Sequence, residues 1–262
     1  MNRALRTAAT GMAAQQLNVD IIAHNLANVN TTGFKKSRPE FQDLMYQTMK
    51  TSGVSTDPNI QGPSEIQVGN GAVPVATTKS FLQGDIQPTN NQLDVAIQGE
   101  GFLQIRRPDG TFAYTRDGSF KISPDGMLVT AQGYAVEPGI TFGSDTTSII
   151  IGRDGTVEAT AVGSSTPEQV GQFELAKFIN PGGLRPIGDN LYIETPASGV
   201  PILGTAGNEG FGEIMQSQLE SSNVDVVEEM VSMITAQRAY EINSKTIKTV
   251  EDMLTIANSI KR

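Results

Sequence analysis

Few side chains in the sequence could carry out acid–base, nucleophilic or metal chemistry. There is no cysteine, and His24 is the single histidine. Without cysteine there can be no disulfide, no thiolate ligand to zinc or to an iron–sulfur cluster, and no thiol nucleophile. With one histidine, a serine–histidine–aspartate triad would have to run through His24. We expect His24 to lie on a helix, pointing away from its apolar row, without a catalytic role.

The other patterns that could hold a ligand are weak. Gly69-Asn70-Gly71 and Gly99-Glu100-Gly101 are isolated glycine pairs without the longer spacing of a phosphate-binding loop. The repeated Asp-Gly dipeptides lack the spacing of a calcium-binding loop, and turn geometry accounts for them. No carboxylate pair stands out among the 28 acidic residues. The sequence therefore predicts no catalytic residue, no cofactor, no metal and no enzymatic activity.

The charge and hydropathy of the chain exclude two further classes of partner. The net charge of −9 argues against general nucleic-acid binding, which needs clustered Lys and Arg to neutralise phosphates. No run of 18 apolar residues is present, so we expect no insertion into a membrane. Polar residues from Gln15 to Asp20 interrupt the apolar run that a secretory signal peptide requires. If the protein leaves the cytosol, we expect it to do so without a cleaved signal.

The distribution of proline and glycine predicts the architecture. All 13 prolines lie between Pro39 and Pro201, and 26 of the 27 glycines lie between Gly33 and Gly212. Helix interiors exclude both residues, so the chain should form a helix, a β-rich body and a second helix. We predict an α+β fold in which long N- and C-terminal helices pair as a coiled-coil stem around a central, mostly antiparallel β body. The predicted parts are a stem of residues 1–30 and 223–262, an extended arm of residues 31–93, and a β-rich outer domain of residues 94–222.

The first segment has the apolar spacing of a coiled coil. Leu5, Met12, Val19 and Leu26 recur every seven residues, and a second row follows three residues later, at Ala8, Gln15, Ile22 and Val29. The spacing predicts a helix from about residue 3 to residue 29. Its small, uncharged flanks favour packing against other subunits, although docking on the chain's own domain is the simpler alternative.

The last segment repeats the pattern over a longer stretch. Val226, Met233, Tyr240, Ile247 and Leu254 recur every seven residues, without glycine or proline. Ser222-Asn223-Val224-Asp225 resembles a helix N-cap, and an uninterrupted run of this length is typical of a coiled coil. A lone stem of two such helices leaves apolar surface on its outer side. Many copies could bury that surface, and contacts that do not close into a ring would generate a helical filament.

The middle of the chain divides at about residue 94. Residues 30–93 are polar and irregular, which fits an extended arm and equally a disordered linker. From residue 94 onward, short β-type runs such as Phe102–Arg106 and Phe112–Thr115 alternate with Asp-Gly pairs. Asp-Gly between two β runs predicts two-residue type I′ hairpin turns. We expect such pairs at Asp109, Asp117, Asp125 and Asp154.

Both ends of the chain carry motifs of a known family. Asn25-Leu26-Ala27-Asn28, followed by Thr31-Thr32-Gly33-Phe34-Lys35, resembles the N-terminal signature of bacterial flagellar rod and hook proteins. Leu219-Glu220-x-Ser222-Asn223 and Ala236-x-Arg238-Ala239-Tyr240 are similar to the C-terminal signature of the same family. The residues that we take as the family signature are Asn25, Leu26, Ala27, Asn28, Gly33, Phe34, Ser222, Asn223, Arg238 and Tyr240.

The resemblance implies a structural role. The chain length and the stretch from Tyr46 to Val73 are similar to the distal rod members of the family. The resemblance then implies a self-assembling subunit of a rigid helical drive shaft between motor and hook, in a basal body that spans the periplasm. Combined with the seven-residue spacing, it predicts that subunits pack through Leu5, Met12, Val19, Ile22, Leu26, Val226, Met233, Tyr240, Ile247 and Leu254.

The same resemblance implies the partners. These are other copies of the chain, the proximal rod, hook and bushing-ring (P- and L-ring) proteins, and the flagellar export apparatus, which would export the chain without cleavage. A proximal rod subunit of the same family is the alternative interpretation. From a different class, an exported cell-wall hydrolase is a second alternative.

Overall fold

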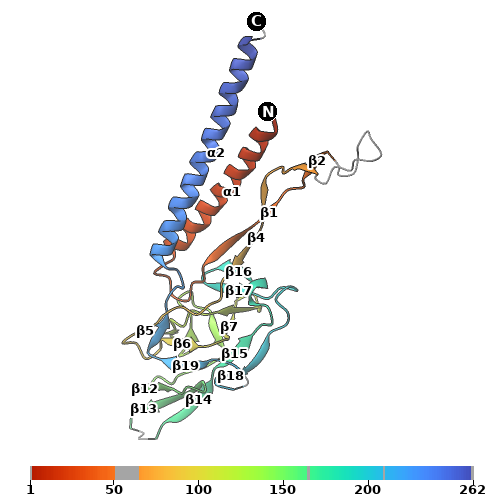
Figure 1. Cartoon of the computed structure of the whole chain (residues 1–262). Helices are drawn as coiled ribbons and strands as arrows, with labels where there is room; N and C mark the ends of the chain where they lie inside the picture. The colour runs from red at the N-terminus through yellow and green to blue at the C-terminus, as the bar shows by residue number, and fades with distance from the viewer. Residues whose placement is uncertain (1, 51–64, 164–165, 209, 261–262) are drawn as a thin grey trace. The chain divides into compact units, whose positions relative to one another are not determined.

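The computed structural model describes residues 2–50, 65–163, 166–208 and 210–260 (Figure 1). Contacts divide the chain into two units. The first contains residues 1–26, 37–78 and 226–262, and the second contains residues 27–36 and 79–225. In the described ranges, no helix combines the length and the apolar character needed to cross a membrane.

The first unit is built on the two terminal helices, α1 (Asn2–Ala27) and α2 (Val226–Ile260). Both are nearly free of residues that break helices, since Gly11 is their one glycine and neither contains proline. Glu228 and Glu229 lie in the first turn of α2, where the helix dipole favours negative charge. The two helices contact each other, and the predicted pairing of long terminal helices around a mostly antiparallel β body is confirmed.

The first unit also contains two small sheets. β1 (Ser37–Asp43) pairs with β4 (Ala72–Lys79), and β2 (Gln47–Lys50) pairs with β3 (Ile66–Val68). Together with β5 (Ile86–Pro88), these strands lie in the region predicted to be an extended arm or a disordered linker. Residues 51–64, which make up half of the stretch from Tyr46 to Val73, lie outside the described residues.

The second unit is built around a nine-stranded antiparallel sheet. Along its main path the order is β16 (Arg185–Gly188), β17 (Leu191–Ile193), β8 (Phe112–Thr115), β7 (Phe102–Arg106), β11 (Ala135–Glu137), β10 (Leu128–Val129) and β9 (Lys121–Ile122). β15 (Glu174–Lys177) joins this sheet beside β7 and carries β18 (Ile202–Thr205) on its other side. The 3₁₀ helix Pro181–Gly183 precedes β16.

Smaller antiparallel sheets complete the second unit. One has the order β12 (Thr146–Ile151), β13 (Thr156–Ala161) and β14 (Glu168–Gln172). β6 (Val95–Gln98) pairs with β19 (Glu213–Gln216), and β5 pairs with β20 (Gln218–Glu220). The main apolar core draws its buried side chains from residues 95–214. A separate aromatic cluster is formed by Phe102, Tyr114, Phe178 and Tyr192 together with Phe81.

The Asp-Gly turns differ from the prediction. At Gly110 the N–H donates to Arg107 O at 3.0 Å, and Arg107 N–H donates to Thr111 O at 2.9 Å. Gly110 has a φ of 78°, whereas Asp109 is not among the residues with positive φ. A type I′ turn with Asp109 and Gly110 at its two central positions needs positive φ at both residues. The turn is instead a type I turn followed by a bulged glycine.

The physical reason lies in the aspartate side chain. Asp109 Oδ1 accepts the Thr111 N–H at 3.0 Å, and this bond favours a turn in which the φ of the aspartate is not positive. The turns at Gly126 and Gly155 repeat the same backbone bonds and positive glycine φ. The pair at Asp117 is not a hairpin turn, since β8 pairs with β7 and β17 and not with β9.

Candidate functional site

The two terminal helices contact each other in one antiparallel register. Asn25 Nδ2 of α1 donates to Glu229 Oε2 of α2 over 3.3 Å. Further along, a Cβ placed on Gly11 would lie 3.0 Å from Asn243 Nδ2. Gly11 lies 14 residues before Asn25, and Asn243 lies 14 residues after Glu229 (25 − 11 and 243 − 229). The close approaches therefore recur at two heptads, as in a coiled coil.

Small and polar side chains predominate among the buried positions of this helix pair. Glycine and alanine let two helix backbones approach closely, and a buried asparagine fixes the register of a pair because a shift would leave it without a partner. The buried residues of the two helices are Ala8, Ala14, Ile21, Ile22, Asn25, Glu229, Ala236 and Val250. The contact row that runs through Gly11 and Asn25 lies one residue before the apolar row predicted from the sequence.

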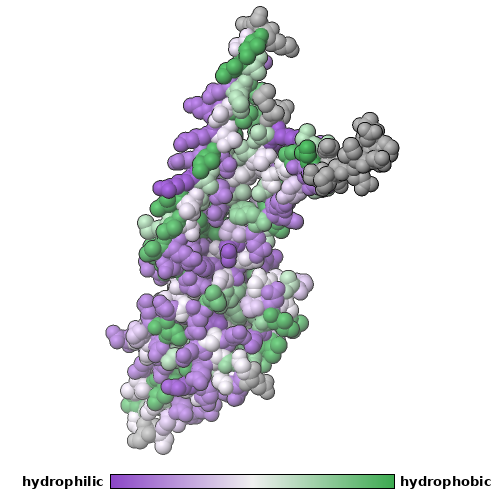
Figure 2. All heavy atoms as spheres, in the orientation of Figure 1, coloured by the Kyte–Doolittle hydropathy of each residue, from purple (hydrophilic) through white to green (hydrophobic). Residues whose placement is uncertain are grey.

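The predicted packing residues lie beside this contact row. Leu5, Met12, Val19, Leu26, Met233, Ile247 and Leu254 are half-buried, and Ile22 is buried. Val226 and Tyr240 are 39% and 40% exposed. Other large apolar side chains of α2 are also exposed: Val227, Met230, Val231, Ile234, Ile242, Met253, Ile256 and Ile260. Figure 2 shows apolar residues in green along the helices. One chain thus leaves much apolar helix surface uncovered.

Asn25 uses both ends of its amide. Its Nδ2 donates to Ser37 O at 2.9 Å, and its Oδ1 accepts the Ser37 N–H at 2.9 Å. Asparagine supplies one donor and one acceptor for this pairing, whereas a carboxylate would supply acceptors alone. The side chain is 2% exposed and fixes the start of β1.

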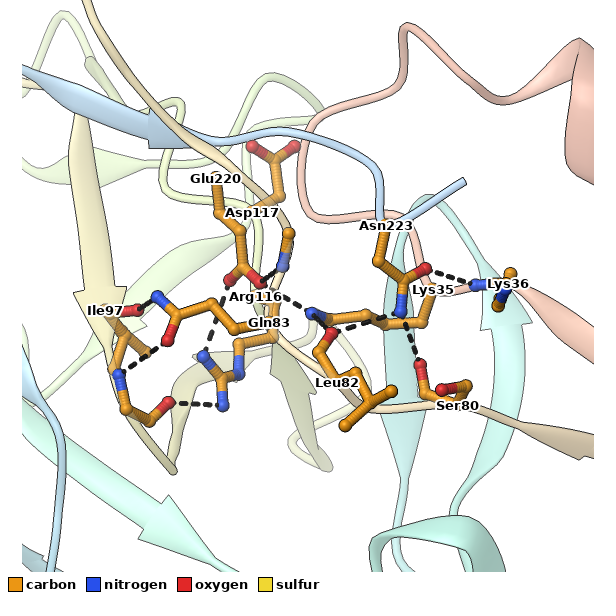
Figure 3. Close-up of polar contacts among 12 residues, drawn as sticks. Lys35, Lys36, Ser80, Leu82, Gln83, Ile97, Arg116, Asp117, Glu220 and Asn223 are labelled. Atoms are coloured by element: carbon orange, nitrogen blue, oxygen red, sulfur yellow. Dashed lines mark hydrogen bonds and ion pairs between the residues drawn. The ribbon is translucent and has the colours of Figure 1, made fainter. Parts of the chain in front are cut away.

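The second unit contains a buried ionic cluster, which we call the Glu220 cluster: Lys35, Arg116 and Glu220 (Figure 3). Lys35 Nζ lies 2.5 Å from Glu220 Oε1, and both side chains are fully buried. Arg116 Nη1 lies 3.4 Å from Glu220 Oε2, and its side chain is 4% exposed. Lys35 also donates to Leu82 O at 2.7 Å, and Arg116 Nη2 donates to Gly99 O at 2.8 Å.

Burial and charge act in opposite directions in this cluster. Burial lowers the pKa of Lys35 and of Arg116, while the Glu220 carboxylate raises both. The Arg116 guanidinium also lies over the Phe102 ring, 5.3 Å from its centroid. Burial raises the pKa of Tyr192, and Glu220 adds to the rise. One carboxylate therefore balances two cations that have left water.

Asn223 forms hydrogen bonds with two other segments of the second unit, one at Lys36 and one at residues 80–82. Its Oδ1 accepts the Lys36 N–H at 2.8 Å, and its Nδ2 donates to Ser80 O at 2.9 Å and to Leu82 O at 3.0 Å (Figure 3). Ser222, also in the predicted signature, has a buried hydroxyl oxygen without a hydrogen-bond partner.

The remaining signature residues divide into structural and exposed positions. Gly33 has a φ of 66°, and a Cβ there would lie 2.7 Å from Asp117 N, so the position requires glycine. Phe34 is buried, with Lys79 Nζ 4.8 Å from its ring centroid. Asn28 Oδ1 accepts the Thr31 hydroxyl at 3.2 Å in the turn after α1. Ala27 and Arg238 are exposed.

Sequence reasoning missed the Glu220 cluster. Lys35 and Glu220 lie inside the motifs that carried the family resemblance, but none of the three residues was predicted to be buried or paired. Lys35 and Glu220 are 185 residues apart in the chain. Among the described side chains, no group of three His, Cys, Asp or Glu residues could hold a metal ion, and His24 is exposed on α1. The geometry of the described residues supports interlocking of chain segments.

Comparisons with known proteins agree along the whole chain. Residues 5–35 match the family of flagella basal body rod proteins, residues 96–159 the flagellar hook protein FlgE/F/G D1 domain, and residues 215–260 the flagellar basal body rod FlgEFG protein C-terminal region. The flagellar basal-body rod protein FlgG of Borreliella burgdorferi is 54% identical over 100% of both chains. FlgG of Caulobacter vibrioides is 49% identical over 99% of both, and FlgG of Bacillus subtilis is 38% identical over 100% of both.

Proposed function

Because the chain belongs to the family of bacterial flagellar basal-body rod proteins, we propose that it is a structural subunit of the distal rod. The observation that supports this assignment is the similarity to FlgG proteins along the whole chain, at 54% and 49% identity. The subunit is not an enzyme. It assembles in the basal body as part of a rigid helical tube that transmits torque from motor to hook.

Assembly through the helical stem is the second part of the proposal. The uncovered apolar side chains of α2, among them Val227, Ile234 and Ile256, are 71%, 49% and 59% exposed in one chain. Burying apolar surface gains about 25 cal/mol per Å², so copies that cover one another's helices are strongly favoured. The predicted packing residues, such as Ile247 and Leu254, flank the intrachain contact row and would meet neighbouring subunits.

A further part of the proposal concerns the stretch from Tyr46 to Val73, which we expect to brace adjacent subunits against bending. Its described ends support contact with α1. Arg3 Nη1 lies 3.7 Å from Met49 Sδ, and Gly71 approaches Thr10 so closely that a Cβ there would overlap the threonine hydroxyl. Met45 and Tyr46 are 86% and 56% exposed, so they are available to a neighbour.

The partners beyond the chain itself follow from family membership. We propose contacts with proximal rod, hook and bushing-ring (P- and L-ring) proteins. We also propose that the flagellar export apparatus exports the chain without cleavage of a signal peptide.

Labelling of isolated basal bodies tests the distal assignment. A short epitope inserted at the exposed turn Asp109–Gly110 should be found on the outer part of the rod, next to the hook. Label confined to the inner part of the rod would instead establish a proximal subunit. Degradation of purified cell wall by the protein, lost on substitution of a specific carboxylate pair, would establish the hydrolase alternative. Mass spectrometry of rod-incorporated protein should find the N-terminal residues intact.

A further inference from the structure

We propose that Glu220 is a conformational latch of the second unit. In this latch, the carboxylate just before α2 holds two other segments closed on the β body. One is the segment that follows α1, residues 27–36, and the other is residues 79–88. The latch is a property of the single chain, so it does not depend on the assembly proposed above.

The contacts of Glu220 reach both segments at once. Its Oε1 accepts Lys35 Nζ at 2.5 Å and the Gly84 N–H at 2.9 Å. Its main-chain oxygen accepts the Gly33 N–H at 2.8 Å. The next residue, Ser221, donates its N–H to Asp85 O at 2.8 Å. The residues around position 220 therefore join residues 33–35 and residues 84–85 to the segment before α2, although these three segments are far apart in the sequence.

The charges make this closure depend on Glu220 itself. Two buried cations, Lys35 and Arg116, share its carboxylate, and the guanidinium cannot lose its proton. Exposed Glu100 also favours the charged form of Arg116, but it forms its own ion pair with Lys177 at 2.6 Å. Removing one partner of a buried ion pair is far more disruptive than replacing the whole set by apolar groups. Without the carboxylate, the cations regain their hydration when the segments open.

The latch can open locally because the main core does not depend on it. The buried side chains of that core come from residues 95–214. β5 and β20, which carry the latch, form a two-stranded sheet of their own. Besides the latch, residues 79–88 contact the β body at Phe81, in the aromatic cluster, and at Gln83, whose Nε2 donates to Ile97 O at 3.0 Å and whose Oε1 accepts the Gly99 N–H at 3.0 Å. Opening these segments therefore leaves the strands β7 and β8 paired.

Amide hydrogen exchange on the full-length chain tests the latch. Glu220→Gln keeps the size of the side chain and one acceptor oxygen but removes the negative charge. The Gly33 and Ser221 amides should exchange at least about 100-fold faster, the range expected when one partner of a buried ion pair is removed. The Leu103 and Thr115 amides, in β7 and β8, should change less than about threefold. Glu213→Gln is the matched control because it removes the exposed pair with Arg153.

A second variant tests whether the ratio of two cations to one carboxylate in the Glu220 cluster matters. Lys35→Met leaves one cation for one carboxylate, so it should speed exchange at Gly33 and Ser221 much less than Glu220→Gln. The double variant Lys35→Met/Glu220→Gln should exchange more slowly than Glu220→Gln alone, because one unpaired cation remains in place of two. If the single variant does not fold, folding of the double variant supports the latch, and failure of both overturns it.

Three other results would overturn the proposal. The first is unchanged protection at Gly33 and Ser221 in Glu220→Gln. The second is an equal loss of protection at Leu103, because the cluster would then act on the whole body. The third is exchange in the double variant at least as fast as in the single one.

Discussion

Asn25 on α1 and Glu229 on α2 are both buried, and the Asn25 amide donates to the Glu229 carboxylate over 3.3 Å. The same amide pairs with both backbone groups of Ser37. One side chain thus fixes the register of the helix pair and the position of the strand that follows α1.

Asn25→Asp should destabilise the first unit by about 2 kcal/mol. The substitution removes the donor to Ser37 O and places a second carboxylate beside Glu229. Urea unfolding followed by the helical circular dichroism signal measures the change. Asn258→Asp, on the exposed surface of α2, is the control and should shift the free energy of unfolding by less than about 0.5 kcal/mol. Equal effects of the two substitutions would contradict this role of Asn25.

Gly33→Ala should cost more than the same change at an open turn. At Gly33 the new Cβ would meet the Asp117 backbone at 2.7 Å, in addition to the strain of positive φ. At Gly110 the φ is 78° and no atom lies within 4 Å, so Gly110→Ala carries the conformational cost alone, about 1–2 kcal/mol. Denaturant unfolding of both variants compares them, and a smaller effect at Gly33 would be inconsistent with the close approach.

Ile247→Asp or Leu254→Asp should abolish rod growth while the β body stays folded. A carboxylate placed in an apolar subunit interface is desolvated without a partner. Electron microscopy of basal bodies measures rod growth, and limited proteolysis of the purified variant reports on the β body. Ser244→Asp, at an exposed position of the same helix, is the matched control and should assemble. Normal rods from either apolar-to-aspartate variant would rule out packing through these residues.

Deletion of residues 51–64 should give a rod that bends more easily. The deleted residues lie in the stretch proposed to brace neighbouring subunits, while the helices proposed to carry assembly are left intact. Bending stiffness can be measured from the curvature of isolated rods in electron micrographs. Rods of unchanged stiffness would show that this stretch does not brace the subunits.

The stability of the second unit should fall between pH 10 and pH 12 in a way that depends on Tyr114. Burial raises the pKa of Tyr114 to about 12, and Glu194 adds to the rise. An unfolded tyrosine ionises near pH 10, so the unfolded state loses its proton first and gains in stability as the pH rises. The contribution of Tyr114 to the free energy of unfolding is therefore complete below pH 10. Above pH 10 it is lost at up to about 1.4 kcal/mol per pH unit.

Comparison of wild type with Tyr114→Phe isolates this contribution. The difference in free energy of unfolding between the two should change steadily from pH 10 to pH 12 and be constant below pH 10. Tyr192→Phe should behave in the same direction, because burial also raises the pKa of Tyr192. Parallel stability curves for wild type and Tyr114→Phe across this range would contradict the prediction.

The elements that follow from local patterns could be predicted from the sequence. The partition of glycine and proline predicted both helices, and the strands Phe102–Arg106 and Phe112–Thr115 have the predicted bounds. The turn type could not be predicted from the dipeptide alone. It depends on a side-chain bond from Asp109 to a backbone amide two residues later, which favours a bulged turn over a type I′ turn.

The candidate site was harder to predict because its contacts join distant residues. Apolar periodicity identified the row Leu5, Met12 and Val19, whereas the helices touch through the adjacent row that contains Gly11 and Asn25. Close approach favours small residues, which a hydrophobicity pattern does not detect. Lys35 and Glu220 could not be paired from the sequence either, since charge alone does not reveal burial across 185 residues.

The shared register of the helix contacts has a mechanical consequence. The contacts at Asn25 and Gly11 are separated by about 21 Å along α1, at a rise of about 1.5 Å per residue. A force that slides one helix along the other strains both contacts at the same moment, because they lie in one register. The pair should therefore keep its length under load until both contacts break together. A shaft made of such pairs would resist sliding of its helices along one another while it transmits torque.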